Sequence, residues 1–335
     1  MQKFIDSPYS DGKAELQFVI KDEVYKKEIF KVYEFYYKCE ETGKEFTTTE
    51  AGDINMLQIF NQYRERKGIL FPEQLIAMRE SYKLSAAKMS DILGFGANTI
   101  SNYEKGEMPS DSSATLLKVA SEPAEFKSIV ETKKSLFSEK QYKDLIHRID
   151  NLIRQENKTS LFNIIWNTKI IPDSNTGYRA PDFDKFANTV LYFINIPWMF
   201  TTRLNKYLFY SDFLNFKHTG YSITGLQYAA IPQGPVPNGY ALLFSLLENE
   251  NYIERESTRT KNDEVYDRYV PKKEFDSEVF CENELKVLKF VKDMLRRKRT
   301  PEIIDLSHKE KGWINNVKVK GIISYQEYGF ELTGI

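Results

Sequence analysis

The most informative stretch of the chain covers residues 75–109, LIAMRESYKLSAAKMSDILGFGANTISNYEKGEMP. Ser85 suits the N-cap of a helix that runs to Ile92, because a serine hydroxyl can accept a hydrogen bond from a free backbone N–H of the first turn. Residues 93–96, Leu-Gly-Phe-Gly, predict a turn, and Ala97–Lys105 predicts a second helix that ends at a glycine. Two short helices with this turn between them indicate a helix-turn-helix.

The second helix carries side chains that suit the recognition of DNA bases. The predicted core between the two helices is apolar and consists of Ala87, Ile92, Leu93, Ile100 and Tyr103. Recognition helices present their polar start to base edges, where Asn can bond bidentately to adenine and Thr or Ser can contact bases or phosphates. The expected DNA-binding residues are Asn98, Thr99, Ser101 and Asn102, with Lys88 and Lys105 beside them.

The charge of this module limits how tightly it can bind DNA alone. Residues 71–130, which we assign to the helix-turn-helix domain, hold six basic and eight acidic residues, a net charge of −2. Because DNA affinity grows with the number of phosphates that basic side chains neutralise, we expect a homodimer that binds two half-sites of operator DNA. A small helical scaffold whose polar residues form a solvated face is the alternative.

Three segments carry a family resemblance: YYKCEETGKEFTTTE at 36–50, NQYRERKG at 61–68 and the stretch at 79–109. Together they resemble the MqsA-type antitoxins over residues 30–130. The resemblance implies a helix-turn-helix that represses its own operon, with Asn98 at a base-reading position. Asn102 stands where a basic residue is common, so the operator need not match. Cys39 stands alone where the family often has two CxxC pairs, so zinc is not carried over.

Composition also indicates what lies before and after the helix-turn-helix domain. Residues 13–50 mix β-branched and aromatic residues and predict a small sheet within an N-terminal region at 1–70. An apolar stripe on a charged helix follows at 131–165. The stretch at 170–183 concentrates Pro, Asp, Asn and Gly as linkers do, so we assign 131–182 to a helical connector and linker.

The C-terminal region, residues 183–335, predicts helices with one small sheet element. Apolar residues recur at helical spacing over 183–194 and 201–217. Tyr252–Arg255 and Val265–Val270 predict a short β-hairpin. With the N-terminal sheet and the helix-turn-helix, the predicted fold class is mainly α with small β elements, an α+β protein.

This region carries a second resemblance. LNKYLFYSDFLNFKHTGYSITGLQYAAIPQGPVPNGY at 204–240, with LSHKEKGW at 306–313, is similar to the Panacea domain, also described as SocA-like. Its most specific pieces are the Tyr210-Ser211-Asp212 stretch, the Gly-Pro-Val-Pro turn and the Ser-His-x-Glu-x-x-Trp run. The resemblance implies an antitoxin domain that recurs beside unrelated toxins and neutralises each by direct contact.

We expect the toxin to bind around the Gly225–Tyr240 turn. Binding energy concentrates on rigid surfaces with aromatic residues, and prolines reduce the entropy that a flexible loop would lose on binding. The candidate toxin-binding residues are Tyr210, Asp212, Tyr228, Gln233, Pro235, Val236, Pro237 and Tyr240.

Composition and motifs exclude several other classes. The 47 basic residues nearly cancel the 48 acidic ones, so the chain does not coat nucleic acid. Two cysteines, Cys39 and Cys281, cannot form a disulfide framework, which favours a reducing compartment. The start lacks an apolar signal-peptide segment and no 18 consecutive residues are apolar, so we expect a cytoplasmic protein with no membrane contact.

Catalysis is not expected either. The chain holds three histidines and lacks the G-x-S-x-G, GxxxxGK(S/T) and HExxH motifs. Asp212, His308 and Glu310 could be imagined as an imidazole and carboxylate site, but a structural role for His308 is favoured. We therefore expect no enzyme activity, no metal and no cofactor.

These observations predict a type II antitoxin with two functions. Its C-terminal domain would bind a cognate toxin protein, and its helix-turn-helix would repress its own operon. Two alternatives stay open: a transcription regulator without a toxin partner, and a proteolytic adaptor that delivers a bound client protein to a protease.

Overall fold

A computed structural model describes residues 1–156, 171–197, 199–259 and 265–334. Contacts divide the chain into two compact units, described separately below: a large unit made of residues 1–62 and 165–335, and a small unit made of residues 63–164. The architecture is mainly helical with small antiparallel sheets, which confirms the predicted α+β class. Within the described ranges no helix is both long and apolar enough to cross a membrane.

The small unit is entirely helical in its described part. It contains the end of α1 (Thr49–Lys67), followed by α2 (Pro72–Ser81), α3 (Ala86–Leu93), α4 (Thr99–Glu104), α5 (Asp111–Ala120), α6 (Pro123–Thr132), η1 (Lys134–Leu136) and α7 (Glu139–Glu156). One apolar core joins these helices, and within it Tyr82 and Phe126 stack with ring centroids 4.1 Å apart. Leu145 and Ile149 of α7 are buried in the same core, so the described part of the predicted connector belongs to this unit. Residues 157–165 of that connector lie outside the described residues.

Local sequence signals explain where α3 begins and ends. The Ser85 hydroxyl accepts a hydrogen bond from the backbone N–H of Lys88 at 3.1 Å, which confirms the predicted N-cap. Gly94 ends the helix with a φ of +73°, a left-handed conformation that a glycine adopts without steric cost. Ile92 and Ile100 are buried as predicted, whereas Ala87 is exposed and takes no part in the core.

A four-stranded antiparallel sheet opens the large unit. Its strands lie in the order β1 (Phe4–Asp6), β2 (Lys13–Tyr25), β3 (Glu28–Cys39) and β4 (Glu45–Phe46). β4 covers only the end of β3, and α1 closes the rest of that edge with side-chain amides. The Asn55 side-chain amide accepts from the backbone N–H of Phe35 and donates to its carbonyl oxygen, and Gln58 does the same with Tyr33. All four distances are 2.8–3.0 Å. The α1 helix thus satisfies the outer edge of β3 as a neighbouring strand would.

The N-terminal sheet and the C-terminal region pack into one unit. The Tyr33 hydroxyl donates to the Glu327 carbonyl oxygen at 2.6 Å, and its ring contacts Phe330. In the interior the Gln326 amide donates to the Gln58 side-chain oxygen at 3.2 Å. Tyr33 and Glu327, for example, lie 294 positions apart in sequence. The N-terminal sheet is therefore built onto the C-terminal region.

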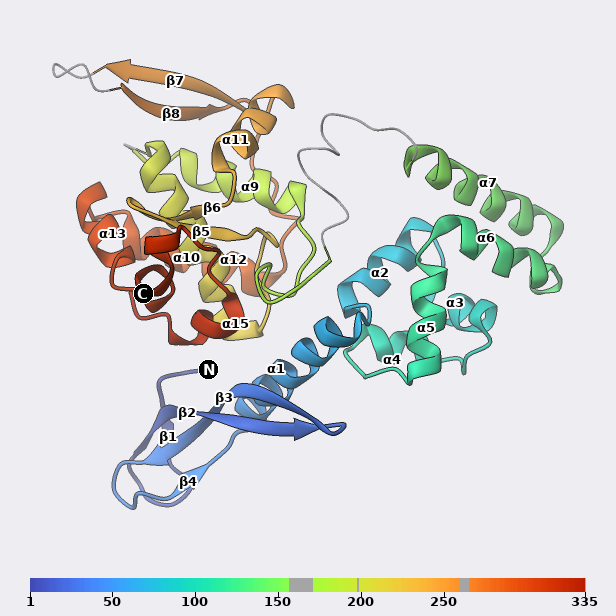
Figure 1. The fold of residues 1–335 in the computed structure, drawn as a ribbon, viewed down its shortest axis with the longest axis horizontal. Coiled ribbons are helices and arrows are strands. Elements are labelled where there is room, and N and C mark those ends of the chain that lie inside the picture. Colours follow the sequence, from blue (N-terminus) through green and yellow to red (C-terminus); the bar gives the residue numbers. More distant parts are fainter. Residues whose placement is uncertain (157–170, 198, 260–264, 335) are drawn as a thin grey trace. The chain divides into compact units, whose positions relative to one another are not determined.

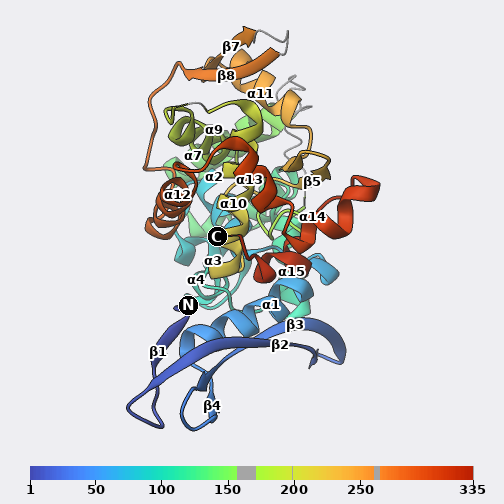
Figure 2. The same ribbon diagram turned by 90° about the vertical axis from the view of Figure 1, so that its left-hand side faces the viewer.

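Most of the large unit surrounds one central helix. Its elements are α9 (Phe183–Ile194), α10 (Thr201–Thr219), β5 (Tyr228–Ile231), β6 (Gly234–Pro237), α11 (Tyr240–Asn249), β7 (Ile253–Arg259), β8 (Val265–Pro271), α12 (Glu282–Leu295), α13 (Thr300–Ser307), α14 (Lys311–Asn316), η2 (Val317–Val319), α15 (Tyr325–Tyr328) and η3 (Gly329–Glu331). α10 lies in the middle, in contact with α9, α12, α13 and β6 (Figures 1 and 2). β7 and β8 form the predicted hairpin.

The predicted linker at 170–183 folds against this unit instead, in its described residues 171–183. Tyr178 and Thr176 are buried, and the Ser222 hydroxyl donates to the Thr176 carbonyl oxygen at 2.7 Å. The backbone N–H of Asp182 donates to the Thr224 carbonyl oxygen at 2.9 Å. The Pro, Asp, Asn and Gly residues form tight turns here, and their composition alone does not distinguish a packed loop from a linker.

Candidate functional sites

The start of α4 presents the polar surface that the sequence predicted for DNA recognition. Asn98, at the N-cap of α4, and Asn102, one turn later, are both exposed, while Thr99 and Ser101 are half-buried. On the opposite side of the helix Ile100 is fully buried. The side chains predicted to contact bases thus point away from the core of the small unit.

Two polar contacts hold α4 in place. The buried Ser90 hydroxyl of α3 accepts a hydrogen bond from the Ile100 backbone N–H at 3.2 Å. At the other end, Arg79 of α2 forms an ion pair with Glu104 at 2.5 Å, and both side chains are largely buried. The Glu104 hydrogen bond raises the pKa of Arg79, so the guanidinium stays charged. A fixed helix is what base recognition by side chains requires.

The two predicted lysines differ in what they can offer to DNA. Lys105 is exposed next to α4. The Lys88 ammonium instead donates to the Leu136 carbonyl oxygen at 2.6 Å and lies over the Phe137 ring, 4.3 Å from its centroid. Lys105 is therefore the better placed of the two for a phosphate contact.

Asp212 of α10 organises the interior of the large unit. Its fully buried carboxylate accepts hydrogen bonds from the backbone N–H groups of Ile223 and Thr224, the Thr224 hydroxyl and the Tyr228 hydroxyl, at 2.6–2.8 Å. Burial raises the pKa of Asp212, and the hydrogen bonds from Thr224 and Tyr228 oppose that rise. The carboxylate thereby fixes the loop between α10 and β5.

A second carboxylate ties the same helix to the C-terminal segment. Glu310 is buried and accepts hydrogen bonds from the backbone N–H groups of Thr333 and Gly334 at 3.1 and 2.7 Å. The Tyr210 hydroxyl donates to it at 3.3 Å. Burial raises the pKa of Glu310, and these donors oppose the rise. Asp212 and Glu310 thus have separate sets of partners and form no shared acid–base pair.

The tight turn between β5 and β6 is held from inside by a buried lysine. Lys206 of α10 donates to the Pro235 carbonyl oxygen at 2.9 Å, and burial lowers its pKa to about 7. Gly234 has a φ of +96°, and a Cβ there would lie 2.5 Å from the Ser307 hydroxyl oxygen and 2.6 Å from Lys206 Cε. Only glycine fits this position.

His308 and Trp313 support the same turn. The two rings stack with centroids 3.8 Å apart, and the Trp313 indole N–H donates to the Ile231 carbonyl oxygen at 2.7 Å. Burial, and then the neighbouring Lys206, lower the pKa of His308, which favours its neutral form. This arrangement fits the structural role that the sequence favoured for His308.

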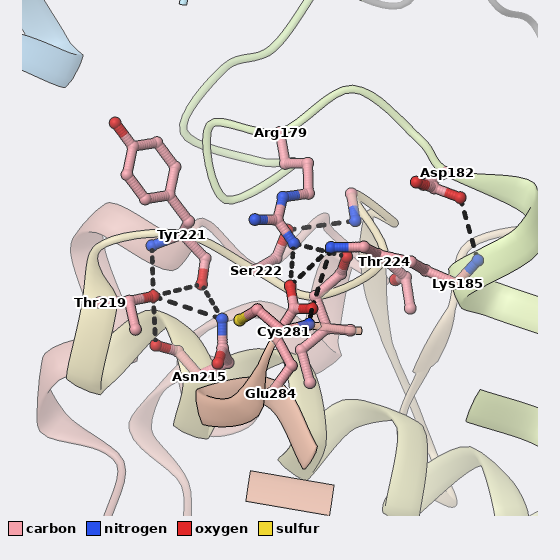
Figure 3. Close-up of polar contacts among 12 residues, drawn as sticks. Arg179, Asp182, Lys185, Asn215, Thr219, Tyr221, Ser222, Thr224, Cys281 and Glu284 are labelled. Atoms are coloured by element: carbon pink, nitrogen blue, oxygen red, sulfur yellow. Dashed lines mark hydrogen bonds and ion pairs between the residues drawn. The ribbon is translucent and has the colours of Figure 1, made fainter. Parts of the chain in front are cut away.

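A buried ion cluster joins the segment before α9 and the first turn of α9 to the start of α12. Figure 3 shows Arg179 and Lys185 directed at the same Glu284 carboxylate, and the Lys185 ammonium lies 2.7 Å from it. Glu284 also accepts a hydrogen bond from the Cys281 backbone N–H at 2.9 Å. Burial alone would raise the pKa of Glu284, but Arg179 and Lys185 outweigh it and the pKa is lowered. This cluster was not predicted, because its three charges lie on different segments.

Most of the predicted toxin-binding residues lie inside the protein. Tyr210, Asp212 and Tyr228 are fully buried, and β6 buries the three residues Pro235, Val236 and Pro237. Gln233 is exposed at the tip of the turn and Tyr240 is half-buried. A partner could contact the six buried residues only after a rearrangement. In this structure they stabilise the turn from inside and form no part of its accessible surface.

Metal-binding side chains are scattered in the part of the chain that the structure describes, where no three His, Cys, Asp or Glu residues form a cluster suited to a metal ion. Cys39 is buried in β3, whereas Cys281 is exposed. The expectation that the protein holds no metal stays a prediction for elemental analysis.

Comparison with known families identifies the centre of the large unit. Residues 204–314 match the family model described as antitoxin SocA-like, Panacea domain. The match confirms the predicted Panacea resemblance over α10 to α14 and supports an antitoxin-type role. Comparison with curated proteins found no match. The MqsA-like resemblance of residues 30–130 stays a prediction.

Proposed function

We propose that the chain is a type II antitoxin that neutralises a cognate toxin protein by direct binding through its large unit. The observation that carries this proposal is the match of residues 204–314 to an antitoxin-family domain. Three buried ionisable groups of that domain, Asp212, Glu310 and Lys206, are bonded to other groups inside the fold. Its function therefore rests on surface contact, and we propose no enzyme activity.

We further propose that the small unit represses the antitoxin's own operon as a homodimer. The exposed Asn98 and Asn102 and the fixed position of α4 support this role. Because the module carries a net charge of −2 over residues 71–130, we expect one copy to bind an operator weakly and two copies to bind it together.

The test uses the protein encoded by the adjacent reading frame. That protein is expressed alone, with the wild-type chain, and with the full-length Asn98→Ala/Asn102→Ala variant. We expect growth arrest by the neighbour alone and rescue by both forms of the chain, because toxin binding and DNA binding use different units. A neighbour that is harmless when expressed alone would contradict the antitoxin function and favour a regulator without a toxin.

A second measurement in the same cells separates blocking from delivery to a protease. If the chain blocks the toxin, the amount of toxin stays constant when the chain is expressed. If the chain is an adaptor, the toxin's half-life shortens in the presence of the protease and recovers when the protease is deleted.

A further inference from the structure

The two edges of the N-terminal sheet differ in how their backbone groups are satisfied. β3 is closed by β4 and by the amides of α1. β1 pairs only with Lys13–Glu15 of β2, and Lys3 extends this pairing by accepting from the Leu16 N–H at 2.8 Å. Beyond Leu16 the outer edge of β2 has no backbone partner in the described part of the chain.

The alternation of a β-strand identifies the residues that face this open edge. Leu16 directs its N–H outward, so Phe18, Ile20 and Asp22 also point their N–H and C=O groups away from β3. The matching outward residues of β3, Tyr33 and Phe35, are the ones that the α1 amides satisfy. Among the residues that the structure describes, one edge of the sheet is therefore closed by the chain itself and the other, beyond Leu16, is open.

The open edge is also unusually apolar. Phe18, Val19 and Ile20 are 42–45% exposed, and Val24 is 71% exposed. Exposed edge strands normally carry charges that prevent pairing with another chain. Here the charges are confined to residues 21–23, where Lys21 forms ion pairs with Glu23 and Glu34, while residues 17–20 carry none.

An apolar groove adjoins this edge. Phe18 lies on the face of β2 that also carries Leu16, next to Phe35 of β3, and these side chains line a cavity of about 890 Å³. Its other walls come from the end of α10, from α12 and from η3, and include Leu214, Lys217, His218, Lys286, Val287, Phe290 and Phe330. Phe290 is 50% exposed. A strand added to β2 would direct alternate side chains towards this groove.

The charges of the groove are mostly positive. Lys3, Lys217 and Lys286 line it, against the single carboxylate of Glu50. His218 also lines the groove, but burial lowers its pKa to about 4, so its imidazole is neutral. The Lys217 ammonium donates to the Leu332 carbonyl oxygen at 2.6 Å. Lys3 and Lys286 form ion pairs with Glu15 and Glu282. Since both pairs are largely exposed, they hold these lysines only weakly. The groove therefore complements side chains that are apolar or carry a carboxylate.

We propose that the open edge of β2 and the adjoining groove bind one extended segment of the toxin. The segment adds a strand beside residues 17–22, with backbone hydrogen bonds to Phe18 and Ile20 and with apolar and acidic side chains in the groove. This inference rests on the proposed function and assigns its contact surface. It moves the contact surface away from the Gly225–Tyr240 turn, whose candidate residues are mostly buried.

The test replaces the outward N–H of β2. Ile20→Pro removes a hydrogen-bond donor that faces the open edge and breaks no bond to β3, so the sheet should stay folded. Ile20→Thr is the matched control, because it keeps the N–H and a β-branched side chain. A third variant, Phe290→Glu, places a negative charge in the groove. Each is made in the full-length chain, and the probe is the purified toxin from the adjacent reading frame.

We expect Ile20→Pro and Phe290→Glu each to weaken toxin binding by about tenfold or more, as expected for central contacts of an interface. Ile20→Thr should stay within about threefold of the wild type, which corresponds to under about 1 kcal/mol. Melting temperature and operator binding should be unchanged in all three. If the wild-type chain binds the toxin and both variants bind it equally well, the surface lies elsewhere and this inference is wrong while the proposed function stands.

The same variants distinguish the other occupants. If Ile20→Pro turns a dimer of the chain alone into a monomer and leaves toxin affinity unchanged, the open edge binds a second copy of the chain and the inference is overturned. If the wild-type chain does not bind the toxin, the proposed function fails, and this assignment fails with it.

Discussion

The α4 surface of the small unit and the α10 region of the large unit were both predicted as contact sites, but they differ in how far their side chains are exposed. Asn98 and Asn102 of α4 are exposed, as their prediction requires. Tyr210, Asp212 and Tyr228 of the α10 region are fully buried and bonded to their own chain. The recognisable residues of the Panacea-like segment thus hold the fold together, and we expect the proposed toxin to contact other residues.

The largest effect that would sharpen this comparison comes from Asp212→Ala. The substitution leaves the N–H groups of Ile223 and Thr224 and the Tyr228 hydroxyl without an acceptor in the interior. Each unsatisfied buried group costs about 1 to 3 kcal/mol, so we expect a loss of about 4 kcal/mol or more in the free energy of unfolding of the large unit. Chemical denaturation measures it.

Asp293→Ala, a carboxylate removed from the exposed surface of α12, is the matched control. We expect its free energy of unfolding to stay within about 0.5 kcal/mol of the wild type. If Asp212→Ala loses no more free energy of unfolding than the control, the α10 motif is not structural. The contrast between the α4 and α10 regions would then be wrong.

A smaller, pH-dependent effect is expected from Lys206. Burial lowers its pKa from 10.5 to about 7, so between these values the unfolded chain binds more protons at this site than the folded chain. The free energy of unfolding should therefore rise with pH in this window, by about 2 kcal/mol from pH 7 to pH 9 through this residue. Lys206→Met should remove that rise, as measured by denaturation at a series of pH values.

Lys309→Met, at an exposed site next to α13, provides the control for this pH series. Its profile should match that of the wild type. If the free energy of unfolding of Lys206→Met rises with pH as steeply as that of the wild type, the explanation is wrong. The rise could then not come from the neutral buried amine of Lys206.

The smallest effect on stability is expected for Asn98→Ala and Asn102→Ala. Both side chains are exposed, so the melting temperature should not change. Operator binding should weaken by about 1 to 3 kcal/mol for each, the usual value of a good base contact. Electrophoretic shift assays with the operon's upstream DNA measure this, with Asn249→Ala on the exposed end of α11 as the control.

If the double variant binds the operator as tightly and specifically as the wild type, α4 is not the recognition helix. A fall in melting temperature without a change in operator affinity would be the reverse of the expected pattern. That result would mean that Asn98 and Asn102, like Asp212, stabilise the fold and do not contact DNA.

Local signals made the small unit predictable. Ser85 and Gly94 set the limits of α3 through capping and a left-handed turn, which depend on residues only a few positions apart. The β7–β8 hairpin was predictable for the same reason. Even there, helical spacing does not determine which residues of a short helix are buried, because Ala87 was predicted in the core and is exposed.

The burial of α10 could not be predicted in this way. Most of its 19 residues are buried, including Lys206 and Asp212, so no polar face distinguishes the side that meets solvent. Which groups satisfy those charges depends on segments far away in sequence, such as the carbonyl oxygen of Pro235. A lysine and an aspartate between the aromatic and leucine residues of α10 were the available signal, and they indicated internal polar contacts as readily as a binding site.

The packing of the N-terminal sheet on the C-terminal region was equally hidden. The contact between Gln58 and Gln326 is between two polar residues that carry no pattern of their own. Asn55 and Gln58 lie three positions apart on α1, a spacing that places them on one face, but the sequence does not show that a strand edge lies opposite. The open edge of β2 became visible only once this closed edge was known.

The central claim is that the large unit binds a toxin by surface contact, independently of DNA recognition. Calorimetric titration of the purified toxin from the adjacent reading frame into the full-length chain tests it most directly. We predict a saturable complex with the same affinity for the wild type and for Asn98→Ala/Asn102→Ala. The absence of binding to the wild type, or a loss of binding in the double variant, would contradict the account.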